Sequence, residues 1–459
     1  MSANTGVVTH GGATHEVNQY YDSVVVQLPG SDITRTTKYC FLSRVDPWDD
    51  PNTPQNEENT PPTVQLSPKN IREVYKNMFI IKRVYPQDMR PMIDRIDWVS
   101  GTVYDYYRDD FDIIARSNGR MVYHHYVKNH YDQVFKCLWN NKRANSTDEP
   151  YFEPGYMSSS LIYYGNDGYK WVYMYTIDAP VKQKFLTETW MPCVLANPAG
   201  FGANTVNSGD VPIIQVHNGG SGYYPTNTTI TITGANTTQA IAYPIINNGV
   251  IQDIRITNAG TNYISANVVI TSPTGVGAVA YANVSPIGGH GSDPFEEFGC
   301  QNIIVTNTFT RDVDGILPTD IRYRQLGFII NPTAKSSYPN QCQNPTYSCS
   351  TDVLVSNGFD GYTSDEIVYQ GSSIDTATFK ATCLSFYTGS NLIKLINTEG
   401  TVANGEALIG STSGTARVVL SVSEPDFVPF SGYITYIENR AGTQRSNDGS
   451  EQIRLIVGF

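Results

Sequence analysis

The sequence predicts a mainly β protein of the α+β class, with a few helices and many turns. Charged residues make up only 16% of its 459 residues, whereas Tyr contributes 31 residues and Gly 38. Short aromatic and β-branched runs that alternate between Gly, Asn and Pro clusters are typical of strands joined by turns. A chain of this length exceeds one ordinary domain, so we expect roughly two to four domains.

The N-terminal part contains three predicted elements. Thr14–Ser23 is expected to be a short helix with Thr14 as its N-cap, and a strand is expected at Asp22–Leu28. Tyr39 to Trp48 is a second strand, which ends in a Pro–Trp turn. The polar, proline-rich residues 49–63 form a loop.

The clearest helix signal begins at Ser67, where an N-cap residue is followed by Pro68 at the first helical position. Apolar residues then recur with helical spacing, so we expect an amphipathic helix that packs on a sheet. These residues are Ile71, Val74, Tyr75, Met78 and Phe79.

Two strands are expected between Met121 and Trp139, and a central strand at Tyr169–Ile177. The turn formers Asn166 to Gly168 precede the central strand. Its two faces are both largely apolar, which indicates cover on both sides. Phe185–Val194 contains a further short element.

After Asn197 the aromatic residues become rarer and an internal repeat begins. Val216-His-Asn-Gly-Gly-Ser-Gly-Tyr223 recurs as Ile256-Thr-Asn-Ala-Gly-Thr-Asn-Tyr263, which gives a period of 40 residues. Each copy is expected to contain a strand, a Gly-rich turn, a Tyr, a second strand and an Ala-rich strand. A unit that cannot bury its apolar face alone must pack on its copy, so Asn204–Val284 is expected to form a small β-domain.

Strands are expected again at Tyr323–Pro332, Ser431–Arg440 and Glu451–Phe459. Between them, Thr363–Val422 holds five short β-like pieces, several of them separated by glycines. This pattern predicts a small barrel or sandwich. The pieces are Glu366–Tyr369, Ala377–Ala381, Leu392–Ile396, Glu406–Ile409 and Ala416–Leu420.

Charge and composition exclude several classes of protein. The net charge of −12 and the lack of a basic run argue against a nucleic-acid partner. The sequence contains no apolar run long enough to insert into a membrane and no secretory signal, so we expect a cytoplasmic protein. Seven cysteines in a reducing compartment are expected to be free and mostly buried, Cys342 and Cys349 included.

No motif predicts a catalytic, metal or cofactor site. His124 and His125 are neighbours in a predicted strand, so they point to opposite faces and do not converge with His130 on a metal. The acidic residues at 109, 110 and 112 are expected to be a solvated loop. Asp312–Gly315 lacks the later ligands of a calcium loop, and Gly219–Gly222 lacks the lysine of a phosphate loop.

Five segments, taken together, resemble a known family. They are Phe41-Leu-Ser-Arg-Val-Asp-Pro-Trp48, Arg95-Ile-Asp-Trp98, Gly168-Tyr-Lys-Trp-Val-Tyr173, Tyr323-Arg-Gln-Leu-Gly-Phe-Ile-Ile-Asn-Pro332 and Tyr436-Ile-Glu-Asn-Arg440. In this order they are similar to segments of the homodimeric baseplate wedge subunit of T-even-like contractile-tailed bacteriophages, of the myovirus and cyanophage type. About half of the chain is covered, and two regions have no counterpart in the family.

The resemblance implies a two-layer β-rich parent domain with two inserted small β-domains. Six landmark residues are expected to fix the parent domain: Trp48, Trp98, Tyr169, Trp171, Tyr323 and Arg440. The expected domains are the parent domain in three parts, residues 1–199, 291–335 and 425–459, the repeat insert, 204–290, and the second insert, 345–422.

The resemblance also implies a structural, non-enzymatic function. The protein would be a structural subunit of the tail baseplate wedge in the virion, assembled in the host cytoplasm. It would bind other wedge proteins and itself, as a homodimer, and tolerate rearrangement of the baseplate on tail contraction. One rival is a host-recognition protein that binds surface glycans through the repeat insert; another is a tail-associated glycosidase, which needs two facing carboxylates.

Overall fold

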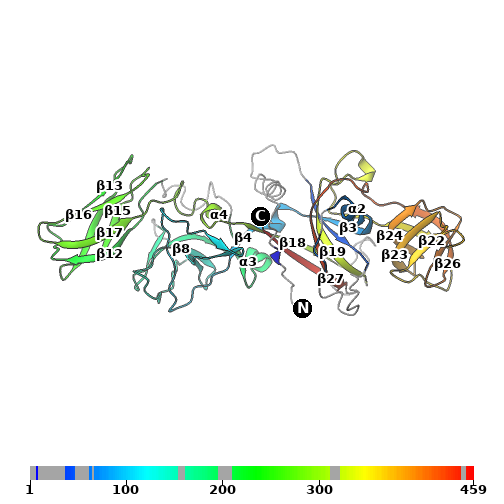
Figure 1. The fold of residues 1–459 in the computed structure, drawn as a ribbon, viewed down its shortest axis with the longest axis horizontal. Coiled ribbons are helices and arrows are strands. Elements are labelled where there is room, and N and C mark those ends of the chain that lie inside the picture. Colours follow the sequence, from blue (N-terminus) through cyan, green and yellow to red (C-terminus); the bar gives the residue numbers. More distant parts are fainter. Residues whose placement is uncertain are drawn as a thin grey trace. The chain divides into compact units, whose positions relative to one another are not determined.

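The computed structural model describes residues 7–8, 37–46, 61–64, 67–153, 161–194, 209–310, 321–445 and 451–458. These residues form many strands and few helices, so the mainly β fold class is confirmed (Figure 1). The predictions at Thr14–Ser23, Asp22–Leu28, Trp48 and Asp312–Gly315 lie outside the described residues.

The chain divides into two compact units. Within the described residues, the first unit contains the chain up to Met89 and from Val305 to Leu455. The second runs from Arg90 to Ile304 and includes the short β1 and the last residues of the chain. This division does not test the domain boundaries expected above, which remain predictions.

The first unit contains a sheet of five strands in the order β20-β3-β2-β19-β27 and a closed barrel. Its elements are β2 (Lys38–Ser43), α2 (Pro68–Asn77), β3 (Met78–Arg83), the 3₁₀ turns η1 (Pro86–Asp88) and η2 (Lys335–Ser337), β19 (Arg322–Ile330), β20 (Thr346–Ser348), β21 (Thr351–Val355), β22 (Ile367–Gln370), β23 (Phe379–Tyr387), β24 (Leu392–Gly400), β25 (Ala407–Gly410), β26 (Ala416–Ser423) and β27 (Tyr433–Gln444).

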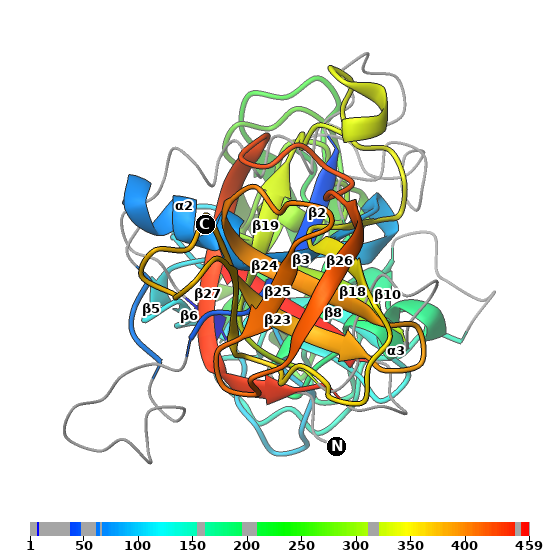
Figure 2. The same cartoon turned by 90° about the vertical axis from the view of Figure 1, so that its right-hand side faces the viewer.

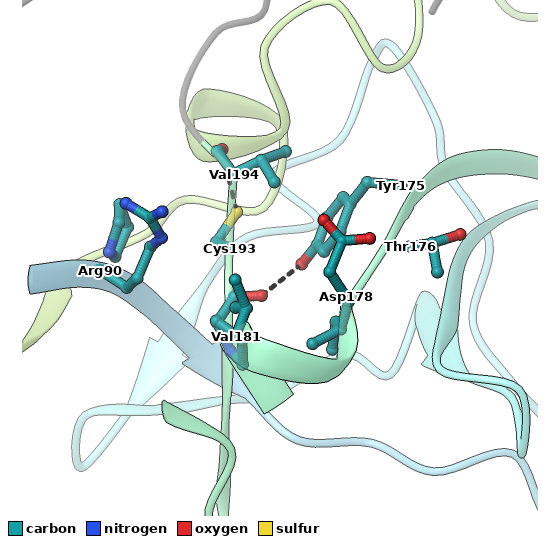
Figure 3. Close-up of a pocket in the computed structure, with 10 residues that line it drawn as sticks. Arg90, Tyr175, Thr176, Asp178, Val181, Cys193 and Val194 are labelled. Atoms are coloured by element: carbon teal, nitrogen blue, oxygen red, sulfur yellow. Dashed lines mark hydrogen bonds between the residues drawn. The ribbon is translucent and has the colours of Figure 1, made fainter. Parts of the chain in front are cut away.

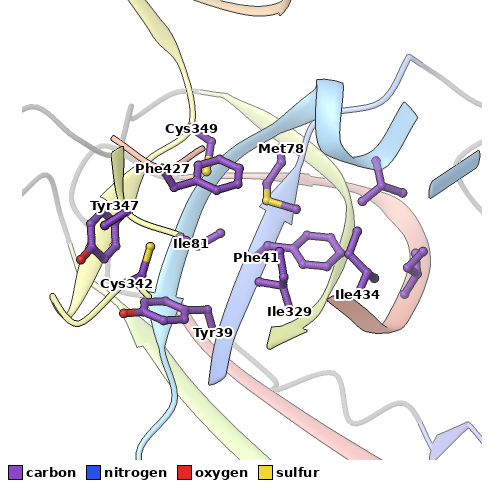
Figure 4. Packing of buried hydrophobic residues seen from close by; sticks show 13 residues of the cluster. Tyr39, Phe41, Met78, Ile81, Ile329, Cys342, Tyr347, Cys349, Phe427 and Ile434 are labelled. Atoms are coloured by element: carbon purple, nitrogen blue, oxygen red, sulfur yellow. The ribbon is translucent and has the colours of Figure 1, made fainter. Parts of the chain in front are cut away.

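Aromatic and branched side chains from several strands fill the core of this five-stranded sheet. Phe41 of β2 and Ile329 of β19 lie among side chains from β3 and β27 (Figure 4). Their strands pair antiparallel, with Leu42 opposite Leu326. Burial of such side chains contributes about 1.5–3 kcal/mol each.

The helix predicted at Ser67 is present as α2, but it is shorter than expected. The Ser67 hydroxyl accepts a hydrogen bond from the Asn70 N–H at 3.2 Å, which confirms the N-cap. The prediction was wrong at the C-terminal end, since Met78 and Phe79 begin β3 instead. Pairing of Met78 with Ser43 of β2 outweighs the helical spacing, and both residues are fully buried.

The barrel occupies the region for which a small barrel or sandwich was predicted. Its strands close in the order β21-β24-β23-β22-β25-β26 (Figure 2, orange). Five of them overlap the predicted pieces, whereas β21 was not predicted. Val353 of β21 is fully buried with Val368 and Leu395, so β21 completes the barrel core.

The second unit contains two further sheets and the repeat. The five-stranded sheet has the order β1-β28-β18-β4-β11, and the four-stranded sheet has the order β7-β8-β10-β9. The boundary between the units falls within β4 (Met89–Asp94), β18 (Asn302–Phe309) and β28 (Glu451–Gly458). The other elements are β1 (Val7–Val8), β5 (Arg116–Ser117), β6 (Arg120–Met121), β7 (Tyr126–Lys128), β8 (Gln133–Trp139), β9 (Ile162–Tyr164), β10 (Lys170–Thr176), α3 (Ala179–Phe185), β11 (Trp190–Pro192) and α4 (Pro294–Glu297).

The predicted central strand is β10, in the middle of the four-stranded sheet. It pairs with β8 on one side and β9 on the other. Five of its residues, Trp171 to Tyr175, are buried, which confirms cover on both faces. Gly168 has φ +84°, a left-handed conformation that suits glycine, so the predicted turn is also confirmed.

The internal repeat folds as two copies of three strands that pair with each other. The strands are β12 (Ile214–Ser221), β13 (Thr229–Thr233), β14 (Ile241–Asn247), β15 (Val250–Asn258), β16 (Asn267–Thr271) and β17 (Val276–Ala282) (Figure 1, green). The pairs β12–β17, β13–β16 and β14–β15 each join the first copy to the second. The prediction that each copy packs on the other is therefore confirmed, and we call residues 214–282 the repeat unit.

The repeated Asn-x-Gly-x-x-Tyr motif has a structural role. Asn258 Oδ1 accepts a hydrogen bond from the Gly260 N–H, and Asn218 does the same for Gly220. The ring of Tyr263 is buried, and its hydroxyl accepts the Ala240 N–H at 2.9 Å. The Gly219–Gly222 segment was expected to be a Gly-rich turn, but β12 continues through it to Ser221, so the turn begins later than predicted.

Gly260→Ala is expected to loosen the repeat unit strongly. Gly260 has φ +69°, and a Cβ there would lie 2.6 Å from the Thr238 carbonyl oxygen. The left-handed backbone costs about 1–2 kcal/mol, and the overpacking adds about 1–3 kcal/mol. The matched control is Gly277→Ala, where φ is +81° but the nearest atom is 3.9 Å away. Hydrogen exchange of β14 and β15 should accelerate much more in the first variant; equal rates would contradict this reading.

The chain enters and leaves the repeat unit at adjacent positions. The Ser285 N–H donates to the Asp210 carbonyl oxygen at 2.9 Å, and the Ser285 hydroxyl donates to the Asp210 carboxylate. Burial raises the pKa of Asp210 to about 6, although the bond from Ser285 opposes this shift. These bonds hold the two ends of the repeat unit together.

Candidate functional site

The landmark residues of the central strand form an aromatic cluster. Trp171 is fully buried and stacks on Tyr169, with ring centroids 5.5 Å apart and 14° between the planes. Tyr104 meets the same indole edge-on, also at 5.5 Å. The Tyr169 hydroxyl donates to the Ala144 carbonyl oxygen at 2.6 Å and accepts the Tyr104 N–H. The cluster therefore links β10 to the segments on either side and offers no surface for a ligand.

Trp98 lies in the same unit but outside this cluster. It is partly buried, and its indole N–H donates to the Ser146 hydroxyl at 3.0 Å. Its backbone N–H donates to the Lys128 carbonyl oxygen beside β7. Trp98 thus anchors the segment after β4 against the four-stranded sheet.

Tyr323 and Arg440 belong to the first unit, on the paired strands β19 and β27. Tyr323 is buried opposite Thr443, and burial raises the pKa of its hydroxyl to about 12. Arg440 is partly exposed, and its Nε donates to Glu438 at 2.7 Å. The described landmark residues therefore support the four-stranded sheet of the second unit and the sheet β20-β3-β2-β19-β27 of the first.

A buried charge cluster in the second unit was not predicted. Lys136 of β8 lies 2.7 Å from Glu297 of α4, and their side chains are 1% and 4% exposed. His290 Nδ1 lies 3.1 Å from the same Glu297 oxygen, and the Gly291 N–H donates to the other. The Lys136 ammonium also lies 4.1 Å from the ring centroid of Tyr107.

Electrostatics keep Glu297 ionised. Burial alone would raise its pKa, but the charge of Lys136 and the bonds from His290 and Lys136 outweigh burial and lower the pKa to about 2. Burial, reinforced by Lys136, lowers the pKa of His290, so its ring is neutral at pH 7. Because the cluster is closed to solvent, it acts as an internal tie between β8 and α4. No sequence signal identifies it, since Lys136 and Glu297 are 161 residues apart.

The histidines that sequence analysis considered do not form a site. His125 is fully buried against Tyr126 and Phe298, and burial lowers its pKa to about 3. His124 is exposed, and His130 pairs with Glu149 at 2.6 Å. The expected strand was wrong here, because Val122 to His125 lie between β6 and β7. In the described ranges, no group of three His, Cys, Asp or Glu side chains is arranged to hold a metal.

The acidic residues after Tyr107 are engaged separately. Asp110 pairs with Arg108 at 2.8 Å on the surface, whereas Asp109 accepts the Val284 N–H at 2.9 Å. A facing carboxylate pair of the kind that glycosidases use is therefore not formed by these two residues.

A cavity of about 270 Å³ lies between β10, α3 and β11 (Figure 3). Arg90 and Asp178 contribute charge to its lining, and the rest is largely apolar. Cys193 also lines it, but burial raises the pKa of this thiol well above its ordinary value. A protonated thiol is a poor nucleophile, so the cavity has no reactive group of this kind.

All seven cysteines are free and buried, as predicted. Cys342 and Cys349 lie in one apolar core with Tyr39 and Tyr347 (Figure 4). Burial raises the pKa of Cys342 to about 11. Both thiols are thus parts of the core.

Comparison with protein families and with curated proteins finds no relative. No model of a protein family matches the sequence. No curated protein matches it either.

Among the described helices, none has the length and apolar character needed to cross a bilayer. The fold and the geometry above therefore define the class of protein, a β-rich protein of two compact units.

Proposed function

We propose that the protein is a structural subunit of a phage tail baseplate wedge and acts by protein–protein binding. As a homodimer, it would hold neighbouring wedge proteins, assemble the baseplate and accommodate its rearrangement on tail contraction. The five sequence segments support this particular identity. The proposal includes no enzymatic activity and places the protein in the virion after assembly in the host cytoplasm.

The observation that carries a binding function is a row of exposed apolar side chains on β14. Ile241, Tyr243 and Ile245 occupy alternate positions of the strand and are 57%, 51% and 39% exposed. Alternate residues share one face of a strand, and the exposed face of a sheet is ordinarily polar. A single exposed apolar residue is common, but a continuous row marks an interaction surface.

Outward-facing apolar side chains also occur elsewhere. Val279 and Tyr281 of β17 are exposed on the repeat unit, and Val418 and Leu420 of β26 are exposed on the barrel. Several faces of this kind suit a subunit that binds several neighbours. Permanent interfaces bury upwards of about 2,000 Å² and rely on aromatic anchors, a role that Tyr243 and Tyr281 fit.

A tagged pull-down from phage-infected cells, combined with sedimentation of the free protein, tests the proposal. We expect a dimer that co-purifies with other baseplate wedge proteins. A monomer that does not co-purify with these proteins but binds the host surface would overturn the proposal and favour the host-recognition function.

The row on β14 can be tested in the same experiment. Ile241→Ser with Ile245→Ser should reduce recovery of at least one wedge protein by about tenfold, the effect of losing about 1.4 kcal/mol. The melting curve should not change, because both side chains are exposed in the free protein. Thr231→Ser on an exposed position of β13 is the matched control and should bind normally. Unchanged recovery with the double variant would exclude this row as a contact.

One observation favours the glycan-binding alternative, namely three exposed tyrosine rings in the repeat unit. Tyr223 and Tyr263 are buried, as their repeat positions indicated, but Tyr224, Tyr243 and Tyr281 are more than half exposed. Tyr243 and Tyr281 lie on strands of different two-stranded sheets.

A further inference from the structure

A second cavity in the second unit has a different character from the one between β10 and β11. Its volume is about 430 Å³, within the range of small-molecule sites. Four segments line it: residues 103–113, Tyr123 between β6 and β7, the end of β8 with the turn that follows, and His217 of β12. We call it the cationic pocket.

Aromatic rings form one wall of the cationic pocket. Trp139 is buried and contacts Tyr106, with ring centroids 5.2 Å apart, and His217, at 4.7 Å. Phe111 and Tyr123 meet edge-on at 5.0 Å, and Phe111 is 42% exposed. The walls are therefore held by contacts among themselves and still present apolar ring surface.

Two positively charged side chains that line the pocket, those of Lys142 and Arg143, have no ion-pair partner in the part of the chain that the structure describes. Within the residues that the structure describes, the side chains of Lys142 and Arg143 make no hydrogen bond or ion pair, and both are exposed. Arg108, the third cation of the lining, is bound to Asp110. The carboxylate of Asp105 accepts the His124 N–H at 2.9 Å. This bond from a neutral N–H does not cancel the carboxylate's charge. Outside the Arg108–Asp110 pair, the lining therefore has two formal positive charges, Lys142 and Arg143, and one negative charge, Asp105, in a chain of net charge −12.

Lys142 and Arg143 lie in a conformationally strained turn after β8. Asn141, Lys142 and Arg143 have φ of +48°, +61° and +64°, three consecutive left-handed residues without a glycine. Asn adopts this conformation readily, whereas Lys142 and Arg143 each cost about 1–2 kcal/mol. Asn140 stabilises the turn, because its Oδ1 accepts the Arg143 N–H and its Nδ2 donates to the Tyr104 carbonyl oxygen. Conformational strain of this kind concentrates at functional sites.

His217 adds a polar group that is uncharged at neutral pH. Burial, together with the charges of Lys142 and Arg108, lowers its pKa. A neutral imidazole both donates and accepts hydrogen bonds. The ring also contacts Tyr281 of β17, with centroids 4.9 Å apart, so it is packed between Tyr281 and Trp139.

We propose that the cationic pocket binds a saccharide unit that carries a carboxylate. The two unpaired cations suit the carboxylate through charge-assisted hydrogen bonds. The aromatic wall suits the apolar C–H face of a sugar ring, and His217 suits its hydroxyl groups. A nucleic acid fits less well, because the acidic chain repels an extended polyanion. This inference does not rest on the baseplate proposal.

Calorimetric titration of the full chain with glucuronic acid at low ionic strength tests the inference. We expect saturable binding of glucuronic acid and at least tenfold weaker binding of glucose, which lacks the carboxylate, and of acetate, which lacks the ring. Absence of glucuronic acid binding, equal binding of acetate or tighter binding of adenosine monophosphate would each overturn the proposal.

Substitutions in the lining test whether glucuronic acid binds in the cationic pocket. Lys142→Gln with Arg143→Gln should weaken glucuronic acid binding at least tenfold, because both unpaired charges are removed. Lys69→Gln, at an exposed lysine of α2, is the matched control and should bind like the unchanged protein. Phe111→Ala should also weaken binding, through loss of the ring face. Because Lys142, Arg143 and Lys69 are exposed, the glutamine variants should melt like the unchanged protein, whereas Phe111→Ala should melt somewhat lower through loss of the contact with Tyr123. Unchanged affinity in the double variant would assign the ligand to another place.

Discussion

Trp171→Ala is expected to give misfolded or insoluble protein. The indole is fully buried between Tyr169 and Tyr104 and forms part of the strand that pairs with β8 and β9. Truncation of a buried Trp to Ala costs about 3–5 kcal/mol, a large share of the 5–15 kcal/mol that stabilises a typical domain. Expression in the soluble fraction and the thermal melting curve provide the measurement.

Two further variants separate loss of packing from other causes. The Trp171 indole N–H makes no hydrogen bond within the described residues, so Trp171→Phe should cost less than half as much as Trp171→Ala. Trp98→Ala, at the partly exposed tryptophan, should remain soluble with a smaller drop in melting temperature. A soluble Trp171→Ala protein with an unchanged melting curve would show that the aromatic cluster does not stabilise the fold.

Glu297→Gln is expected to destabilise the second unit to a similar extent. It would leave the Lys136 ammonium buried beside a neutral amide, and removal of one partner from a buried ion pair costs about 3–5 kcal/mol. The matched control is Asp110→Asn, which breaks the exposed pair with Arg108 and should change stability by at most about 1 kcal/mol. Hydrogen exchange of β8 and urea unfolding of both variants provide the comparison.

A double variant tests whether the loss comes from the unpaired charge. Lys136→Met with Glu297→Gln removes both charges and should recover part of the stability that Glu297→Gln loses, because no buried ion remains. A double variant less stable than Glu297→Gln would indicate that Lys136 contributes mainly through its contact with Tyr107.

The same pair predicts a pH dependence. The pKa of Glu297 in the folded protein is about 2, below its ordinary value of 4.5, so the carboxylate contributes stability above pH 4.5. That contribution is lost as the pH falls through 4.5 toward 2. The difference in stability between the unchanged protein and Glu297→Gln should therefore shrink over this range, as unfolding curves recorded at successive pH values would show.

The repeat shows how much of this fold is local in the sequence. A 40-residue period, with Gly and Tyr at equivalent positions, predicts both the strands and the need for the copies to pack together. Strand alternation at Tyr169–Ile177 and the Ser67–Pro68 helix start are signals of the same kind, because backbone preference and side-chain periodicity act over a few residues. These elements are present in the structure as predicted.

The sequence by itself determined the mainly β class, the repeat, the central strand and the free thiols, since each depends on neighbouring residues or on composition. Tertiary structure alone decided that α2 ends at Asn77, that β21 completes the barrel, and that Lys136 meets Glu297. It also brought His217 beside Trp139 and the cations of the turn after β8. These outcomes depend on strand pairing and on contacts between residues far apart in the chain. Such contacts produce no periodic pattern in the sequence from which they could be predicted.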